Sequence, residues 1–180
     1  MKLETIRQEL ENSIAVKQAA LKDELLLAAI MELAENCLNA LKSGGKIIFC
    51  GNGGSFADSQ HLSAEFTSRF MFDRASLPSL ALGTNSSSMS AIANDYGYEN
   101  WLKMALNFYS DKNDLIILIS ASGNSPNMIN AARYIKNKKN PIVTFTGFYG
   151  KNKLIKYGNI NFVVNSKNFN DIENIHQYWL

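Results

Sequence analysis

Two loops rich in glycine and serine contain the residue types that suit an anion-binding site. Their sequences are GNGGS at residues 51–55 and SASGNS at residues 120–125. Glycine lets backbone N–H groups approach a ligand closely, and a helix that begins after each loop would add further free N–H groups. Neither loop has the G-x-x-x-x-G-K-S/T or G-x-G-x-x-G pattern of nucleotide sites, so no nucleotide cofactor is expected. Ordinary turn chemistry would explain one such loop, whereas two together predict a phosphate carried by a molecule smaller than a nucleotide.

Two pairs of acidic and basic side chains have spacings that suit chemistry on one helix face. His61 and Glu65 are four residues apart behind the first loop, which fits acid–base catalysis or metal binding as well as a simple surface pair. Glu173 and His176 are three residues apart near the end of the sequence, and a structural role is an equal alternative there. The chain has only these two histidines, and neither is next to a serine or cysteine nucleophile, so the sequence does not support a catalytic triad.

Alternating strands and helices would position these residues. Apolar runs predict five strands, at residues 46–50, 79–82, 114–119, 141–145 and 160–164. Apolar residues at helical spacing predict helices at residues 4–42 with a break near Asp23, from the first loop to Phe70, 88–109 with an interruption at 94–97, 126–137 and 171–180. Asn94 and Asp95 fall in this interruption, where a cap and turn is the favoured role, and Ser125 can cap the helix that starts at Pro126.

This alternation predicts an α/β fold, a three-layer αβα sandwich around a central, mostly parallel sheet of five strands. The length suits a single domain over residues 1–180, with an N-terminal helical segment at 1–42 and the αβα core at 43–180. Ligands of such sheets bind beyond the carboxyl ends of the strands, and each loop directly follows a predicted strand. Both loops are therefore expected at the ligand-binding edge.

Composition narrows the classes of protein and partner. Hydrophobic residues make up 46% and charged residues 19% of the chain, which excludes a disordered protein. A net charge of +2 gives no argument for a nucleic-acid partner. The sequence has no apolar run of about 18 residues and no signal-peptide core, so a cytoplasmic protein without a membrane partner is expected. Cys37 and Cys50 match neither a zinc-ligand spacing nor a disulfide framework, and reduced, buried thiols are expected.

Three motifs resemble those of the phosphoheptose isomerases, also called sedoheptulose 7-phosphate isomerases, within the wider sugar isomerase (SIS) fold. They are GNGGS-x-AD-x-QH-x-x-x-E at residues 51–65, ANDYG at 93–97 and S-x-SGNS at 120–125. The resemblance covers essentially the whole chain. It implies a ketose–aldose isomerase that converts sedoheptulose 7-phosphate to D-glycero-D-manno-heptose 7-phosphate through a cis-enediol, for bacterial surface polysaccharide. It also implies a homotetramer with active sites at the subunit interfaces.

The resemblance assigns roles to individual residues. Glu65 matches the catalytic carboxylate; in members that hold zinc, His61 and Glu65 are ligands, and Glu173 is a further candidate ligand. The implied substrate contacts are Asn52, Gly53, Gly54, Ser55, Asn94, Asp95 and Glu173, with the phosphate held by Ser120, Ser122 and Ser125. A carboxylate at Glu65 can move the carbon-bound proton, and a histidine or a zinc ion would polarise the carbonyl group.

The last segment departs from the family pattern. Glu173 stands where the family has glutamine, which would place a second negative charge beside Glu65. The family's catalytic, zinc-binding histidine would fall at position 181, one past the last residue, so the final helix is expected to be truncated. His176 matches a different family histidine, and it would point about 140° away around the helix. Two alternatives therefore stay open: a catalytically impaired sugar-phosphate sensor, and a relative of the SIS proteins that associate with a replication initiator.

Overall fold

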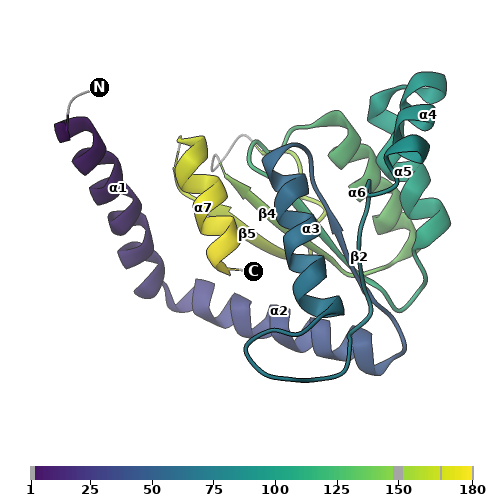
Figure 1. Ribbon diagram of the computed structural model, residues 1–180, viewed down its shortest axis with the longest axis horizontal. Helices are drawn as coiled ribbons and strands as arrows, with labels where there is room; N and C mark the ends of the chain where they lie inside the picture. The colour runs from purple at the N-terminus through teal and green to yellow at the C-terminus, as the bar shows by residue number, and fades with distance from the viewer. Residues whose placement is uncertain (1–2, 148–151, 167, 180) are drawn as a thin grey trace.

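Five parallel strands form one sheet in the order β2-β1-β3-β4-β5. Figure 1 shows this sheet together with the helices that surround it. The computed structural model describes residues 3–147, 152–166 and 168–179. The strands are β1 (Ile47–Cys50), β2 (Ser79–Ala81), β3 (Leu115–Ser120), β4 (Ile142–Gly147) and β5 (Ile160–Val164). All neighbouring strands pair in parallel, and the predicted fold class is confirmed.

Helices cover both faces of this sheet. They are α1 (Leu3–Leu21), α2 (Glu24–Lys42), α3 (Gly54–Thr67), α4 (Ser86–Tyr96), α5 (Tyr98–Tyr109), α6 (Pro126–Lys138) and α7 (Phe169–Trp179). Side chains from α5 and α6 pack on one face, and side chains from α2, α3 and α7 pack on the other. β3 gives Ile116 and Leu118 to the first core and Ile117 and Ile119 to the second, which explains why its sequence is almost purely aliphatic.

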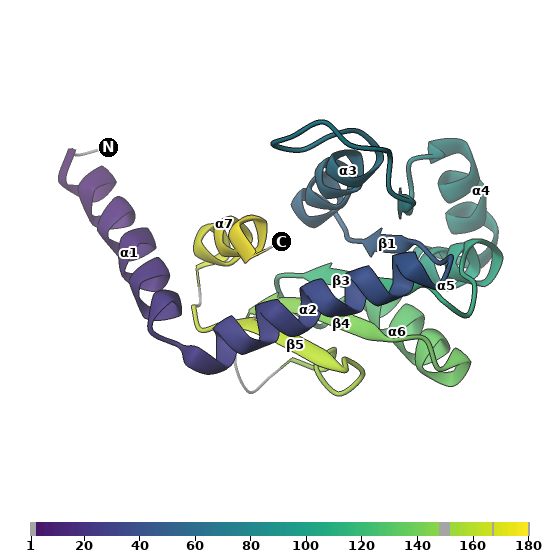
Figure 2. The same cartoon turned by 90° about the horizontal axis from the view of Figure 1, so that it is seen from below.

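The N-terminal helical segment breaks where the sequence predicts. Asp23 caps α2, because its side chain accepts a hydrogen bond from the N–H of Leu26 at 3.0 Å. α2 packs on the sheet through Leu33 and Ala40, whereas α1 has no buried residue and projects from the sandwich (Figure 2). Neither helix, nor any other in the described ranges, combines the length and apolar content that crossing a membrane requires.

The end of α3 comes earlier than predicted. α3 ends at Thr67 rather than Phe70. The guanidinium of Arg74 donates hydrogen bonds to the carbonyl oxygens of Glu65 and Phe66, which lie in the last turn. These bonds satisfy carbonyl groups that have no partner within the helix, so the chain can leave the helix at this point.

The predicted interruption of the helix at residues 94–97 is confirmed at its last residue. It falls at Gly97, whose positive φ of 84° ends α4. Asn94 and Asp95 lie within the last turn of α4, so their predicted role as cap and turn is wrong. The last helix begins at Phe169, two residues before the predicted start, and its predicted end, Leu180, lies outside the described residues.

Candidate functional site

The two loops predicted to bind an anion lie side by side at the carboxyl edge of the sheet. We call residues 51–55 the glycine loop and residues 120–125 the serine loop. β1 and β3 are neighbours, with Cys50 in register with Leu118, so the loops that follow these strands start at adjacent positions. In a sheet of order 2-1-3-4-5, β1 and β3 flank the point where the strand order reverses, which is where ligands bind in such sheets.

The glycine loop turns sharply from β1 into α3. A Cβ atom on Gly51 would overlap the carbonyl group of Ser55, and Gly53 has a positive φ of 54°, so both positions favour glycine. Gly53 is the N-cap residue of α3 and offers no side chain to the first N–H groups of the helix. The start of α3 therefore keeps N–H groups for a ligand, and the helix dipole favours negative charge there.

The serine loop joins β3 to α6. Ser120 is buried at the end of β3, whereas Ser122 and Ser125 are half-buried. The Ser122 hydroxyl accepts a hydrogen bond from the N–H of Asn124 at 3.2 Å. Ser125 is the N-cap residue of α6 and Pro126 follows it, as predicted, but within this described helix the Ser125 hydroxyl makes no capping hydrogen bond. The predicted side-chain cap is therefore wrong, and the start of α6 resembles the start of α3.

A pair of amide side chains connects the two loops. Asn52 Nδ2 donates to Asn127 Oδ1 at 3.0 Å, and Asn127 Nδ2 donates back to Asn52 Oδ1 at 2.8 Å. The Tyr98 hydroxyl donates to the same Asn52 oxygen at 3.0 Å. Sequence reasoning missed Asn127 and Tyr98. The position of Asn127, two residues after Ser125, is a usable signal, whereas nothing in the sequence around Tyr98 indicates this contact.

α7 packs against the N-terminal part of α3. A Cβ atom on Gly54 would lie 3.2 Å from each carboxylate oxygen of Glu173, so this carboxylate faces the start of α3. The partial positive charge at a helix N-terminus stabilises a carboxylate in that position. Gln177 Nε2 donates to Oδ1 of the buried Asp58 at 2.6 Å, one turn further along α3. Sequence reasoning gave Asp58 and Gln177 no role, because only the fold brings α7 to α3.

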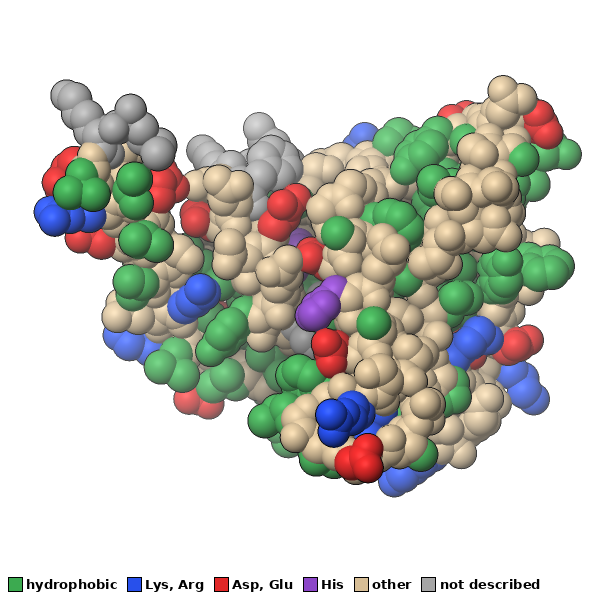
Figure 3. Space-filling view, viewed as in Figure 1, with side chains coloured by type: hydrophobic (Ala, Val, Ile, Leu, Met, Phe, Trp, Pro, Cys, Tyr) green, Lys and Arg blue, Asp and Glu red, His purple; other side chains and the backbone are tan. Residues whose placement is uncertain are grey.

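His61 and Glu65 share one face of α3, as the spacing predicts. His61 Nε2 lies 3.8 Å from Glu65 Oε1, and the two side chains are 72% and 32% exposed. Figure 3 shows histidine and acidic side chains on the open surface over α3. The geometry fits the predicted acid–base or metal role and also the surface-pair alternative.

Glu65 lies near the opposite end of α3 from the glycine loop. It is eleven positions after Gly54. This separation is about 16 Å along a helix that rises by about 1.5 Å per residue. Because Glu173 faces Gly54, it does not lie beside Glu65 within a single chain, contrary to the prediction. Asn94 and Asp95 are exposed on α4, where Asn94 Nδ2 donates to Asp95 Oδ1 at 2.9 Å. A single chain thus joins the two loops and Glu173, and leaves Glu65 apart from them.

His176 is buried between α7 and the sheet. Its Nε2 lies 3.2 Å from the carbonyl oxygen of Thr146, and its ring packs edge-on against Phe145 with centroids 5.9 Å apart. Burial disfavours the charged form and lowers the pKa of His176 to about 4, so the ring is neutral at neutral pH. The sequence leaves either a chemical or a structural role open for the Glu173 and His176 pair. For His176, the buried position supports the structural role.

The neutral, buried His176 predicts a loss of stability in acid. The pKa of His176 in the folded state, about 4, is below the ordinary value of 6.5. The stability that comes from burying the neutral ring is therefore complete above pH 6.5 and is lost progressively as the pH falls to 4, because the unfolded chain binds the proton more readily. A shift of this size corresponds to about 3 kcal/mol of unfolding free energy. Urea unfolding between pH 6.5 and pH 4 should show this loss of unfolding free energy in the wild type and not in His176→Leu. An identical pH dependence in both proteins would contradict the assignment.

Zinc needs more ligands than these residues bring together. A catalytic zinc site takes three protein ligands. His61 and Glu65 offer two, Glu173 faces the other end of α3, and no group of three or more His, Cys, Asp or Glu side chains gathers in the described part of the chain. Cys37 and Cys50 are free, and burial raises the pKa of the half-buried Cys37 to about 11. The described residues of the chain therefore do not fit a complete zinc site.

Known proteins are similar to this chain in both sequence and fold. A family model for SIS domains matches residues 10–147. Phosphoheptose isomerases of Burkholderia pseudomallei (strain 1710b) and Aneurinibacillus thermoaerophilus are both 46% identical, over 77% and 81% of this chain and 73% of each relative. The structure of a phosphoheptose isomerase from Francisella tularensis has a TM-score of 0.93 at 27% identity and covers 99% of this chain and 94% of that one. A phosphoheptose isomerase structure from Neisseria gonorrhoeae has a TM-score of 0.88 at 31% identity, covering 98% and 93%. The chain belongs to the SIS-domain family and, within it, to the phosphoheptose isomerases.

Proposed function

We propose that this protein is a ketose–aldose isomerase that converts sedoheptulose 7-phosphate to D-glycero-D-manno-heptose 7-phosphate. The observation that carries the proposal is the pair of adjacent helix starts, α3 and α6, whose loops are joined by Asn52 and Asn127. Neither start is closed by a side-chain cap in the described helices, so N–H groups and serine hydroxyls converge on one edge of the sheet. Such a site suits a phosphorylated sugar, in agreement with the name of the relatives.

The serine loop is the better place for the phosphate. Glu173 already presents its carboxylate to the start of α3, and a phosphate bound there would meet a like charge. At the start of α6, Ser120, Ser122 and Ser125 can donate hydroxyl hydrogens to phosphate oxygens. The glycine loop then meets the sugar, together with Asn94, Asp95 and Glu173.

Glu65 is the base in this proposal. It takes a proton from C1 of the ketose, the C–H electrons form the C1–C2 double bond of the cis-enediol, and the same proton or one from solvent is returned to C2. A second proton must pass from the C1 oxygen to the C2 oxygen. His176 does not serve this transfer because it is buried against Thr146, whereas His61 is exposed 3.8 Å from Glu65.

We propose that a second copy of the chain completes each site, as in a homotetramer with interfacial sites. The distance from Gly54 to Glu65 along α3 supports this, because a base must approach within about 3 Å of the proton that it takes. Apolar side chains that a partner could cover are also present: on α1, Leu3, Leu10 and Ile14 are 64%, 60% and 53% exposed.

Three finer points belong to the same proposal. Zinc binding would need a ligand beyond His61 and Glu65. A cytoplasmic location is supported by the free thiols of Cys37 and Cys50, since reducing compartments keep cysteines unpaired. The product is a seven-carbon aldose phosphate, which suits the synthesis of heptose for bacterial surface polysaccharide.

The direct test is incubation with sedoheptulose 7-phosphate in deuterated water, with and without added zinc. NMR follows deuterium at C1 and C2 together with the appearance of the aldose. We expect deuterium incorporation and aldose formation, because the proton held by Glu65 exchanges with solvent between its removal and its return. The substrate incubated without protein is the control.

Two other results would each favour one of the alternative functions. Binding of the sugar phosphate without deuterium exchange or product would contradict the isomerase and favour the sensor. Absence of both binding and exchange, with capture of a replication initiator by the purified protein, would favour the third alternative.

A further inference from the structure

Asn127 lies at the centre of the two loops without belonging to either of them. It is 2% exposed, on the first turn of α6, and its amide faces Asn52. We propose that Asn127 is a positioning residue: it fixes the amide of Asn52 so that Asn52 meets the substrate as a hydrogen-bond donor. This inference rests on the proposed function, because it assigns a donor role within the same site.

The hydrogen bonds of the Asn52 side chain occupy its oxygen and leave one of its two N–H hydrogens available to a ligand. An amide oxygen has two acceptor positions, and those of Asn52 are taken by Asn127 Nδ2 at 2.8 Å and by the Tyr98 hydroxyl at 3.0 Å. An amide nitrogen has two hydrogens, and one of them goes to Asn127 Oδ1 at 3.0 Å. Among the described residues, the second N–H of Asn52 has no hydrogen-bond partner. Asn52 can therefore donate to a substrate oxygen, and it has no acceptor position left for a substrate hydroxyl.

The reciprocal pair also couples the orientation of the Asn52 amide to that of the Asn127 amide. A lone asparagine turns readily about its last side-chain torsion, which exchanges its oxygen and nitrogen. Turning Asn52 alone, with Asn127 unchanged, would set its oxygen against Asn127 Oδ1 and its nitrogen against Asn127 Nδ2, so two partly buried hydrogen bonds would be lost. Asn127 thereby holds the glycine loop and the serine loop in one arrangement.

A double-mutant cycle tests this role. kcat/KM for sedoheptulose 7-phosphate is measured for the wild type, Asn52→Ala, Asn127→Ala and the double variant. We expect each single substitution to lower kcat/KM by about 100-fold, since small misplacements in an active site have effects of this size. The kcat/KM of the double variant should be within about twofold of that of Asn52→Ala, because Asn127 no longer has an Asn52 amide to position.

Tyr98→Phe provides a second variant that removes only one hydrogen bond. Tyr98 is 49% exposed, so the fold should tolerate the loss of its hydroxyl even if Asn127→Ala proves unstable. We expect a loss of about fivefold in kcat/KM, the effect of one ordinary hydrogen bond, and no further loss in the Asn52→Ala background.

Asn130→Ala is the matched control. Asn130 lies on the same helix, and its Nδ2 donates to the carbonyl oxygen of Glu99 at 3.0 Å rather than to either loop. Loss of the Asn130 amide should change the melting temperature and leave kcat/KM unchanged. Losses that multiply in the double variant, or an Asn127→Ala enzyme with unchanged kcat/KM, would overturn the inference in an active enzyme. A wild-type protein that neither turns over nor binds the sugar phosphate would instead refute the proposed function, and this inference with it.

Discussion

Glu65→Gln should abolish the isomerase reaction while the protein still binds its substrate. The amide keeps the shape and polarity of the side chain, but it cannot take a proton from C1. Because proton transfer by a positioned base contributes about 10²- to 10⁴-fold to a rate, we expect kcat to fall by about 1,000-fold. Affinity for sedoheptulose 7-phosphate should stay within about threefold, since the lost interaction belongs to the transition state. NMR in deuterated water measures the first effect, and titration calorimetry measures the second.

The fold should survive this substitution. The Glu65 side chain is 32% exposed, and its contact with His61 at 3.8 Å is an exposed pair of little energetic value. Glu35→Gln makes the same chemical change at an exposed position of α2 and serves as the control, with unchanged turnover expected. If Glu65→Gln turned over at the wild-type rate, Glu65 would not be the base.

Local sequence patterns predict the sheet and its helices because the relevant forces act over a few residues. The aliphatic run in β3 is needed to fill both cores at once, so it identifies a central strand without further information. Asp23 and Gly97 mark helix ends by their own side-chain or backbone properties. The early end of α3 is different, because it depends on Arg74, which reaches back from the following loop to carbonyl groups of the helix.

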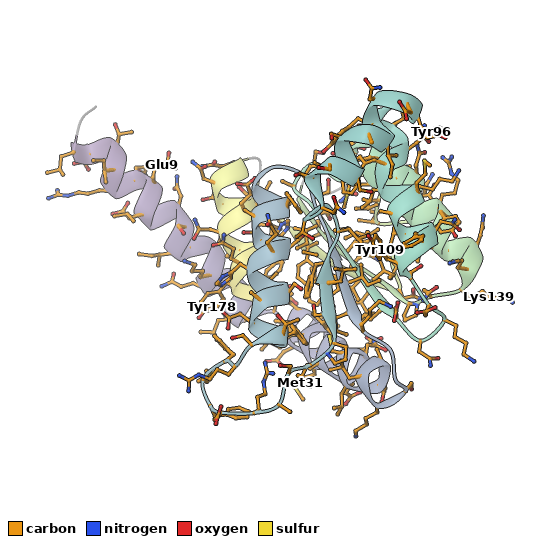
Figure 4. The ribbon with its side chains drawn as sticks, turned by 45° about the vertical axis from the view of Figure 1, so that its right-hand side comes forward. Glu9, Met31, Tyr96, Tyr109, Lys139 and Tyr178 are labelled. Atoms are coloured by element: carbon orange, nitrogen blue, oxygen red, sulfur yellow. The ribbon has the colours of Figure 1, made fainter. Side chains whose placement is uncertain are left out.

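The candidate site is predictable only in part, for a related reason. The glycine and serine loops follow their strands directly, so the parallel topology alone puts them together. The contacts of Glu173 with Gly54 and of His176 with Thr146 depend on how α7 crosses the sheet, which no local pattern specifies. Tyr178 illustrates the same limit: it is bulky, yet it is 75% exposed on α7, near Lys17 of α1 (Figure 4).

Mixing two inactive variants should restore activity if each site draws its base from another copy of the chain. One parent is Glu65→Gln, which lacks the base. The other is Ser125→Asp, whose carboxylate can cap α6 and keep the helix stable while it repels the phosphate. Each parent alone should retain at most about a hundredth of the wild-type rate. In randomly mixed oligomers about a quarter of the sites combine an intact serine loop with an intact Glu65, because the two come from different subunits.

The expected gain is therefore from about a hundredth to about a quarter of wild-type activity, which co-expression of the two chains with different affinity tags can measure. A site contained in one subunit predicts no gain at all, since every subunit then carries one defect. The control is a chain with both substitutions, co-expressed with Glu65→Gln: every Glu65 is then absent, and no pairing of subunits can restore the base. Mixed oligomers that are isolated through both tags and remain inactive would contradict the shared site.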